Sequence, residues 1–285
     1  MPDRLKIALM LAPTLCVIGV LFFGGLAVIV IRSFSYMPSL GLTEPNLVAY
    51  REVFGSEVFL SSLGLSLHIA LTSTLLSLIL AIAAALLLRQ VRVGRAAIHF
   101  LFQLNLTVPH IVGAIGILYL FSQSGSFARA GYHAGLIGKP ADFPALVFDP
   151  YAIGIILQYV WKEVPFIGVI ILAQMRTIGP DYEAVARTLG ATNWQRFRHV
   201  LLPLILPGAL SASVIVFAFA FGAYEIPLLL GASHPVALPV LAYRTYTDVD
   251  LTSRPAAMAM AVTIAILSAG LIWAYLRIAR RGLRQ

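Results

Sequence analysis

Charged residues are scarce in this chain. Of its 285 residues only 11% are Asp, Glu, Lys or Arg, whereas 60% are apolar, and the mean hydropathy is +0.90. An average soluble domain has about 25% charged residues, so a water-soluble fold of this size could not cover its surface with so few. The scarcity excludes intrinsic disorder and an ordinary cytosolic enzyme, and it indicates a protein whose solvent is mostly lipid.

Several motifs that carry chemistry are also missing. The single cysteine, Cys16, cannot form an intrachain disulfide. A phosphate-binding loop needs Gly-x-x-x-x-Gly-Lys-[Ser/Thr], but the sole Gly-Lys pair, Gly138–Lys139, is followed by proline. There is no His-Glu-x-x-His zinc motif and no Gly-x-Ser-Gly nucleophile, and the six histidines are scattered. The sequence therefore predicts no catalytic residue, no metal ligand and no nucleotide site, which argues against an intramembrane enzyme.

Six apolar runs are long enough to cross a membrane. A spanning helix needs about 20 mostly apolar residues, because the hydrocarbon core is about 30 Å thick and each residue rises about 1.5 Å. The first run is too long for the apolar part of a cleaved signal, so we expect it to remain as a span. The sequence predicts an all-α membrane protein with six transmembrane helices, near Ile7–Ile31, Ser61–Leu88, Ile98–Phe121, Tyr151–Gln174, Leu204–Leu230 and Ala256–Leu276.

Basic residues are distributed unequally between the loops that join these runs. Thirteen Lys and Arg lie near the two termini and in the loops that contain residues 89–95 and 176–198, against six in the intervening loops. Because Lys and Arg favour the cytoplasmic side, we expect both termini in the cytoplasm. Pro109, Pro165 and Pro227 interrupt central runs and free backbone carbonyls, which favours a translocation path over simple kinks.

Residues 179–203, in the third of these basic loops, predict two short helices. Pro180 suits the start of the first helix and Gly190 its end. Thr192 begins the second helix, and Gln195 three residues later completes a capping box. We therefore expect a compact helical hairpin in the cytoplasm, joined directly to two spans.

The first helix of this hairpin has two different faces. Tyr182, Val185 and Leu189 are spaced to form one apolar face, and Glu183 and Arg187 are spaced for an i, i+4 ion pair. An exposed apolar face beside charges suits docking into a groove of another protein. The alternative is a helix pair that lies on lipid headgroups, and the physical arguments do not separate the two.

These residues resemble the EAA loop of ABC importer permeases. Glu183–Ala186 matches its E-A-A start, Gly190 stands seven residues after the glutamate, and Leu202–Pro203 ends the apolar stretch. Val185 departs from the pattern, because an alanine usually stands there. Similarity in layout extends from about Asn46 to the C-terminus. The resemblance implies the type I ABC importer permease fold, with a cytoplasmic coupling-helix loop.

The same resemblance implies a division of labour between subunits. The stretch 182–189 would be a coupling helix seated in a cleft of an ATP-binding-cassette ATPase dimer, where Glu183 would meet a basic residue. That dimer would bind ATP and Mg²⁺, so we expect no cofactor and no enzymatic activity in this chain. The expected ATPase-coupling residues are Tyr182, Glu183, Ala184, Ala186, Arg187, Leu189 and Gly190.

Further partners follow from the resemblance. They are a periplasmic or lipid-anchored solute-binding protein, a second and related permease subunit, and membrane lipid, whereas nucleic acid is not expected. The chain would be a multi-pass protein of the bacterial inner membrane. The expected layout is an N-terminal helix with the first periplasmic loop at 1–56, a core domain at 57–277 containing the loop 179–203, and a basic cytoplasmic tail at 278–285.

Two carboxylates, Glu163 and Glu225, lie within predicted spans, beside aromatics and shortly before a proline. Ionisable groups inside a membrane are expensive and indicate function, and a carboxylate with aromatic walls can hold an organic cation. Two alternatives stay open, namely that Lys162 pairs with a carboxylate and that Glu225 lies at the outer interface. The substrate-path candidates are Asn105, Tyr159, Glu163, Tyr224 and Glu225.

The chain as a whole most resembles the spermidine and putrescine branch of the family. That implies a polyamine or related organic cation as the solute, with thiamine, ferric iron, phosphonate or a sugar as alternatives. An ion-coupled secondary transporter is a different class, in which Glu163 and Glu225 could carry protons along broken helices. It would leave the loop 179–203 unexplained, and the energy source of uptake distinguishes the two classes.

Overall fold

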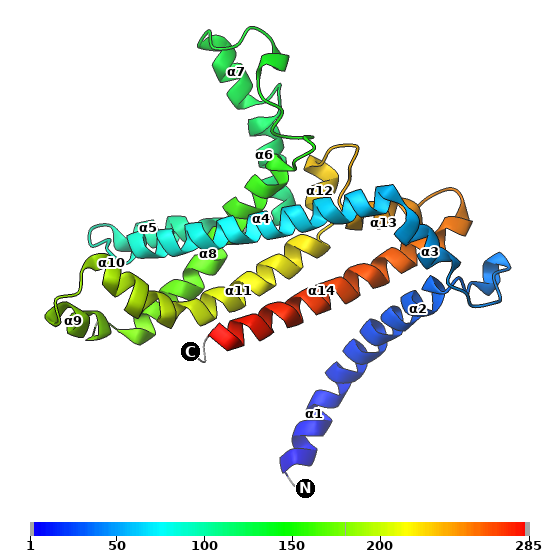
Figure 1. Ribbon diagram of the computed structural model, residues 1–285, viewed down its shortest axis with the longest axis horizontal. Coiled ribbons are helices and arrows are strands. Elements are labelled where there is room, and N and C mark those ends of the chain that lie inside the picture. Colours follow the sequence, from blue (N-terminus) through cyan, green and yellow to red (C-terminus); the bar gives the residue numbers. More distant parts are fainter. Residues whose placement is uncertain (1–2, 180, 283–285) are drawn as a thin grey trace. The chain divides into compact units, whose positions relative to one another are not determined.

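The computed structural model describes residues 3–179 and 181–282 of the chain, and those residues are helical apart from turns and loops (Figure 1). Within these ranges it contains no β-strand, only an isolated bridge between Met37 and Leu42. Pro180, the expected first residue of the hairpin, and the last residues of the expected basic tail, 283–285, lie outside the described residues.

The chain divides into two compact units. One unit takes its described residues from Met1–Leu60 and Leu238–Ile266, and the other from Ser61–Ala237 and Leu267–Gln285. The expected layout of 1–56, 57–277 and 278–285 stays a prediction.

Six helical segments of the described residues are long and apolar enough to cross a membrane, as predicted. Five of them overlap most of the predicted run, and the third is displaced. The segments are Leu5–Ser33, Glu57–Leu88, His110–His133, Ile153–Ile178, Asn193–Gly222 and Leu251–Ala274.

The first unit begins with a long helix whose apolar side chains are almost all exposed, as expected of a surface that meets lipid. It consists of α1 (Asp3–Ile18), a π-helical turn (Gly19–Phe23) and α2 (Gly24–Ser33). After α2 the chain folds back through α3 (Val48–Gly55), where the Tyr50 and Ser33 hydroxyls hydrogen-bond at 2.8 Å. The unit also contains α13 (Leu238–Tyr246), the 3₁₀ turn Leu251–Ser253 and the first part of α14 (Arg254–Gly282).

The second unit is built around α8 (Ile153–Ile178), which packs along α11 (Leu202–Gly222) and against α4 (Glu57–Leu88) (Figure 1). Small side chains allow this close packing, as is usual between membrane helices. The buried cluster consists of Ala81, Ala85, Leu88, Ile167, Ile171, Leu172, Leu201, Ile205, Ala209, Ala212 and Val216. Some buried hydroxyls bond within their own helices, as Ser73 Oγ does to the carbonyl of Ile69 at 2.6 Å.

The third and fifth predicted spans are each broken by a turn. The predicted helix Ile98–Phe121 is two helices, α5 (Arg95–Leu104) and α6 (His110–Phe121), separated by a 3₁₀ turn (Asn105–Thr107) and Pro109. Proline cannot donate to the preceding turn and drives the residue before it out of the helical region. The segment of spanning length therefore starts at His110.

The fifth predicted span ends early because α11 stops at Gly222. After Ala223 and Tyr224 the chain restarts as the short helix α12 (Glu225–Leu230). Pro165, by contrast, lies inside α8 without ending it. The remaining short helices are the 3₁₀ turn Pro38–Leu40, α7 (Ser126–His133), the 3₁₀ turn Pro140–Asp142, α9 (Asp181–Thr188), α10 (Asn193–Arg196) and the π-helical turn Phe197–Leu201.

Candidate functional site

The predicted hairpin is present as α9 and α10, at the end of α8 and before α11 (Figure 1). Gly190 has φ +83°, a left-handed conformation that a side chain disfavours. The Thr192 N–H donates to Gln195 Oε1 at 2.8 Å, and the Gln195 N–H donates to Thr192 Oγ1 at 3.3 Å. Both the glycine turn and the capping box are confirmed.

The hairpin exposes its apolar side chains. Tyr182 and Val185 are each 60% exposed, Leu189 is 82% exposed, and Trp194 of α10 is 62% exposed. Leu201, the last residue of the π-helical turn before α11, is buried in the helix core. Both helices of the hairpin therefore expose large apolar side chains, while Leu201, which follows the hairpin, is anchored in the bundle.

Glu183 pairs with Arg89, the residue that follows α4. Arg89 Nη1 donates to Oε1 at 2.5 Å and Nη2 donates to Oε2 at 3.2 Å, so the carboxylate is held by both oxygens. The predicted pair between Glu183 and Arg187 is wrong, because a guanidinium 94 positions away occupies the carboxylate instead. Sequence spacing revealed only partners on the same helix.

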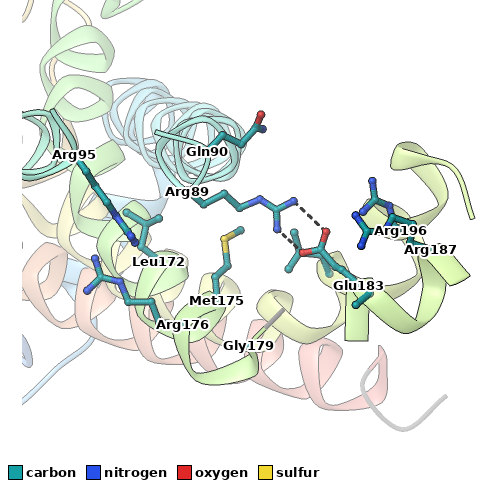
Figure 2. A pocket seen from close by; sticks show the side chains of 12 residues that line it. Arg89, Gln90, Arg95, Leu172, Met175, Arg176, Gly179, Glu183, Arg187 and Arg196 are labelled. Carbon is teal, nitrogen blue, oxygen red and sulfur yellow. Dashed lines mark hydrogen bonds and ion pairs between the residues drawn. The ribbon is translucent and has the colours of Figure 1, made fainter. Parts of the chain in front are cut away.

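This ion pair lines a cavity of about 650 Å³ (Figure 2). Its lining comes from the link between α4 and α5, the start of α5, the end of α8, the helices α9 and α10, and the π-helical turn before α11. Five arginines line it, together with Glu183 as its carboxylate. The lining residues are Arg89, Gln90, Arg95, Leu172, Met175, Arg176, Gly179, Glu183, Ala184, Arg187, Arg196 and Leu201. We call this the arginine cavity. It brings together basic residues that the charge distribution assigned to one side of the membrane.

Of the remaining hairpin candidates, Ala184 and Arg187 line the arginine cavity. Tyr182 and Leu189 belong to the exposed apolar surface. Ala186 is half-buried, and its carbonyl accepts the Ala191 N–H at 3.0 Å as the helix ends. The structure therefore divides the predicted coupling residues between an outward apolar surface and an inward charged one.

A second polar group lies in the middle of α8. The Lys162 ammonium donates to the carbonyls of Asn105 at 2.6 Å and Leu106 at 3.2 Å, and also to that of Val108. These carbonyls belong to the break before Pro109. We call Lys162 and these three carbonyls the Lys162 cluster. It answers the open question about Lys162, whose three donors are taken by carbonyls and not by a carboxylate.

The substrate-path candidates Asn105, Tyr159 and Glu163 lie beside this cluster. The Asn105 side-chain amide donates to the Trp161 carbonyl. Glu163 Oε1 lies 3.2 Å from Nε2 of His110, the first residue of α6. Tyr159 is fully buried, with its ring edge-on to that of Phe219, 6.1 Å away.

The other two candidates lie where α11 ends. Tyr224 precedes α12, and Glu225 is its first residue, where a negative charge suits the helix dipole. The helix that Glu225 begins, α12, packs against α8, which carries Tyr159 and Glu163. The candidates therefore lie on two helices that are in contact, with Tyr159 and Glu163 on α8 and Glu225 on α12.

Sequence reasoning missed three contributors, namely Arg89, His110 and Phe219. His110 could have been suspected, because it directly follows the proline that breaks the span. The others are distant in sequence from their partners and carry no local signal. Within residues 3–179 and 181–282, no group of three or more His, Cys, Asp or Glu side chains is placed to hold a metal ion.

Comparison with known proteins points to one family. The profile described as "Binding-protein-dependent transport system inner membrane component" matches residues 73–283. The Molybdenum transport system permease protein ModB of Mycobacterium bovis is 31% identical over 211 residues, which cover 73% of this chain and 75% of that protein. The Sulfate transport system permease protein CysT of Escherichia coli is 23% identical over 224 residues, covering 78% and 77%.

A solved structure shares the fold over nearly the whole chain. It is a chain of a bacterial alginate ABC transporter in complex with an alginate pentasaccharide-bound periplasmic protein. The TM-score is 0.83 at 20% identity, covering 99% of this chain and 96% of that one. At this identity the likeness concerns the fold alone.

Proposed function

We propose, because this chain belongs to the family of binding-protein-dependent transport system inner membrane components, that its α9–α10 hairpin receives the movement of an ATPase. The chain is the permease subunit of an ABC importer and a multi-pass protein of the inner membrane. It is not itself an enzyme, because ATP hydrolysis belongs to a separate subunit of such importers.

The uncovered apolar surface of the hairpin is the observation that carries this proposal. Tyr182, Val185, Leu189 and Trp194 expose large apolar areas, whereas a surface that meets water is normally polar, and contiguous exposed apolar groups mark interaction sites. The hairpin continues directly from α8 and into α11, which pack along each other. A push on the hairpin would therefore reach the centre of the bundle.

The assembly that follows has four kinds of component. The hairpin and both termini lie in the cytoplasm, where an ATPase dimer binds ATP and Mg²⁺ and contacts Tyr182, Glu183 and Gly190. A second and related permease subunit completes the path, and a periplasmic or lipid-anchored binding protein delivers the solute. The unequal loop charges support this orientation.

Coupling is tested in proteoliposomes that contain the complete importer. Changing Glu183→Ala together with Gly190→Leu is expected to reduce uptake and solute-stimulated hydrolysis by about tenfold or more, equivalent to about 1.4 kcal/mol of lost coupling. The matched control is Glu44→Ala with Gly135→Leu. Glu44 is exposed, and Gly135 has φ +72° and open space beside it, like Gly190. Normal transport by the hairpin variant would overturn the proposal.

For the solute we propose a small oxyanion. The support is the likeness to permeases named for molybdenum and sulfate transport, since molybdenum dissolves in neutral water as an oxyanion. The polyamine expected from sequence has no such support among these relatives. The argument that the Glu163 carboxylate binds an organic cation is also weaker, because this carboxylate already faces His110.

A saccharide is the second candidate for the solute, because the transporter of similar fold is an alginate transporter. The assembled importer separates these solutes by stimulated ATP hydrolysis with sulfate, molybdate, trehalose, an alginate oligosaccharide, spermidine, thiamine, ferric iron and a phosphonate. We expect stimulation by sulfate or molybdate. Stimulation by spermidine alone would restore the polyamine, and stimulation by saccharides alone would establish the second candidate.

A further inference from the structure

The arginine cavity carries an excess of positive charge. Its lining holds five guanidinium groups, on Arg89, Arg95, Arg176, Arg187 and Arg196, and the carboxylate of Glu183 as counter-charge, which leaves a net charge of +4. The arginines come from separate elements, so their meeting in one hollow is a product of the fold and not of a single basic stretch of sequence. Like charges around one hollow repel unless an anion joins them.

Internal partners account for only part of this charge. Arg89 uses both terminal nitrogens on Glu183. Among the described residues, the other four arginines make no ion pair. Arg196 donates from Nη2 to the Asn193 side chain, but its Nε is buried and has no hydrogen-bond partner in the described part of the chain. A buried donor without an acceptor destabilises the fold by about 1–3 kcal/mol, and a bound anion would relieve it.

We propose that the arginine cavity is a binding site for a tetrahedral oxyanion, supplied as a free ion such as sulfate or phosphate, or as the phosphate group of an anionic phospholipid. Guanidinium forks match the geometry of such oxygens and bind them through charge-assisted hydrogen bonds. An anion there would link the end of α8, the start of α5 and the α9–α10 hairpin. The site belongs to this chain alone, so it does not depend on which solute is imported.

The site is tested on the full-length chain with two variants of equal charge. Arg176→Gln with Arg196→Gln removes two lining arginines that have no ion-pair partner. The control, Arg92→Gln with Arg198→Gln, removes two exposed arginines that lie outside the lining. Thermal unfolding in detergent establishes that both variants fold.

The first arm measures free ions. Radiolabelled sulfate and radiolabelled phosphate are each titrated against detergent-solubilised chain by equilibrium dialysis at low ionic strength. The second arm measures lipid. The chain is placed in nanodiscs of phosphatidylcholine with phosphatidylglycerol, and the phosphatidylglycerol molecules retained on release are counted by native mass spectrometry.

We expect the cavity variant to lose binding by tenfold or more in one arm, while the control binds like the wild type. Loss in the dialysis arm identifies a free oxyanion, and loss confined to the nanodisc arm identifies a phospholipid headgroup. Wild-type chain that binds in neither arm overturns the proposal. So does a cavity variant that binds as well as the control in both arms.

Discussion

Two polar assemblies, one at the middle of α8 and one that lines the cavity at its end, differ in their exposure to solvent. In the Lys162 cluster the charged residue is 5% exposed, and its ammonium is surrounded by carbonyls. In the pair between Arg89 and Glu183 the side chains are 32% and 20% exposed, and the pair lines an open cavity. Both join segments that are far apart in the sequence, but their physical roles differ.

Burial decides what each assembly contributes. Breaking the Lys162 cluster would leave three carbonyls of the broken third span without their donor, and within a membrane little water is present to donate in its place, so we expect the cluster to stabilise that break. The pair between Arg89 and Glu183 can exchange its partners with water and ions, so it contributes little to stability and can open. The buried Lys162 cluster is therefore expected to stabilise the fold. The partly exposed pair between Arg89 and Glu183 is suited to open and close reversibly.

The largest expected effect comes from Lys162→Met. Loss of the ammonium leaves the carbonyls of Asn105, Leu106 and Val108 without a donor, so the free energy of unfolding should fall by about 2–3 kcal/mol. Thermal or denaturant unfolding in detergent measures it, and Lys6→Met, at an exposed position of α1, is the control. An unchanged stability would show that water reaches the break. The Lys162 cluster would then contribute no more to stability than the more exposed pair between Arg89 and Glu183.

A smaller effect is expected when the packing beside the cluster is changed. A methyl group at Gly113 of α6 would lie 2.6 Å from Gln158 Nε2 and 2.8 Å from Trp161 Cζ3, whereas one at Gly116 meets nothing within 4 Å. Overpacking of this kind destabilises by about 1–3 kcal/mol. Gly113→Ala should therefore unfold at a lower temperature than Gly116→Ala. Equal melting temperatures would mean that α6 and α8 leave room for a methyl group at Gly113.

The smallest expected effect is that of the pair between Arg89 and Glu183. A double-mutant cycle with Arg89→Gln and Glu183→Gln should give a coupling free energy of about 0.2–1 kcal/mol, as for other solvent-accessible ion pairs. The value should shrink as salt rises from about 0.01 to 1 M, because the Debye length falls from about 30 to 3 Å. A coupling free energy above that range and insensitive to salt would show that the pair is shielded from solvent and stabilises the fold, as is expected of the Lys162 cluster.

Local features of the fold were predictable from the sequence. The six spans follow from apolar runs of bilayer length, and the hairpin follows from Gly190 and the capping box of Thr192 and Gln195, because each depends on residues that are near neighbours. The break in the third span could be predicted only in part. Pro109 indicates an interruption, but the apolar run continues on both sides of it, so the sequence predicts one helix where the structure has two.

Long-range pairings could not be predicted in the same way. Glu183 has a well-spaced arginine on its own helix, yet the fold brings Arg89 closer, and no periodicity encodes that choice. Lys162 presented a similar difficulty, because a neighbouring carboxylate is the obvious partner for an ammonium in a sequence. Its actual acceptors are backbone carbonyls, which exist at every residue and become available only where a helix breaks.

The contact between Arg89 and Glu183 also limits how the hairpin can move. The chain itself fixes the hairpin at two places, the end of α8 and the start of α11, and two fixed points leave rotation about the line between them. The guanidinium adds a third anchor at the end of α4, and three points define a plane. With the contact closed, a displacement of the hairpin would be shared by α4, α8 and α11, whereas with the contact open it would be shared by α8 and α11 alone.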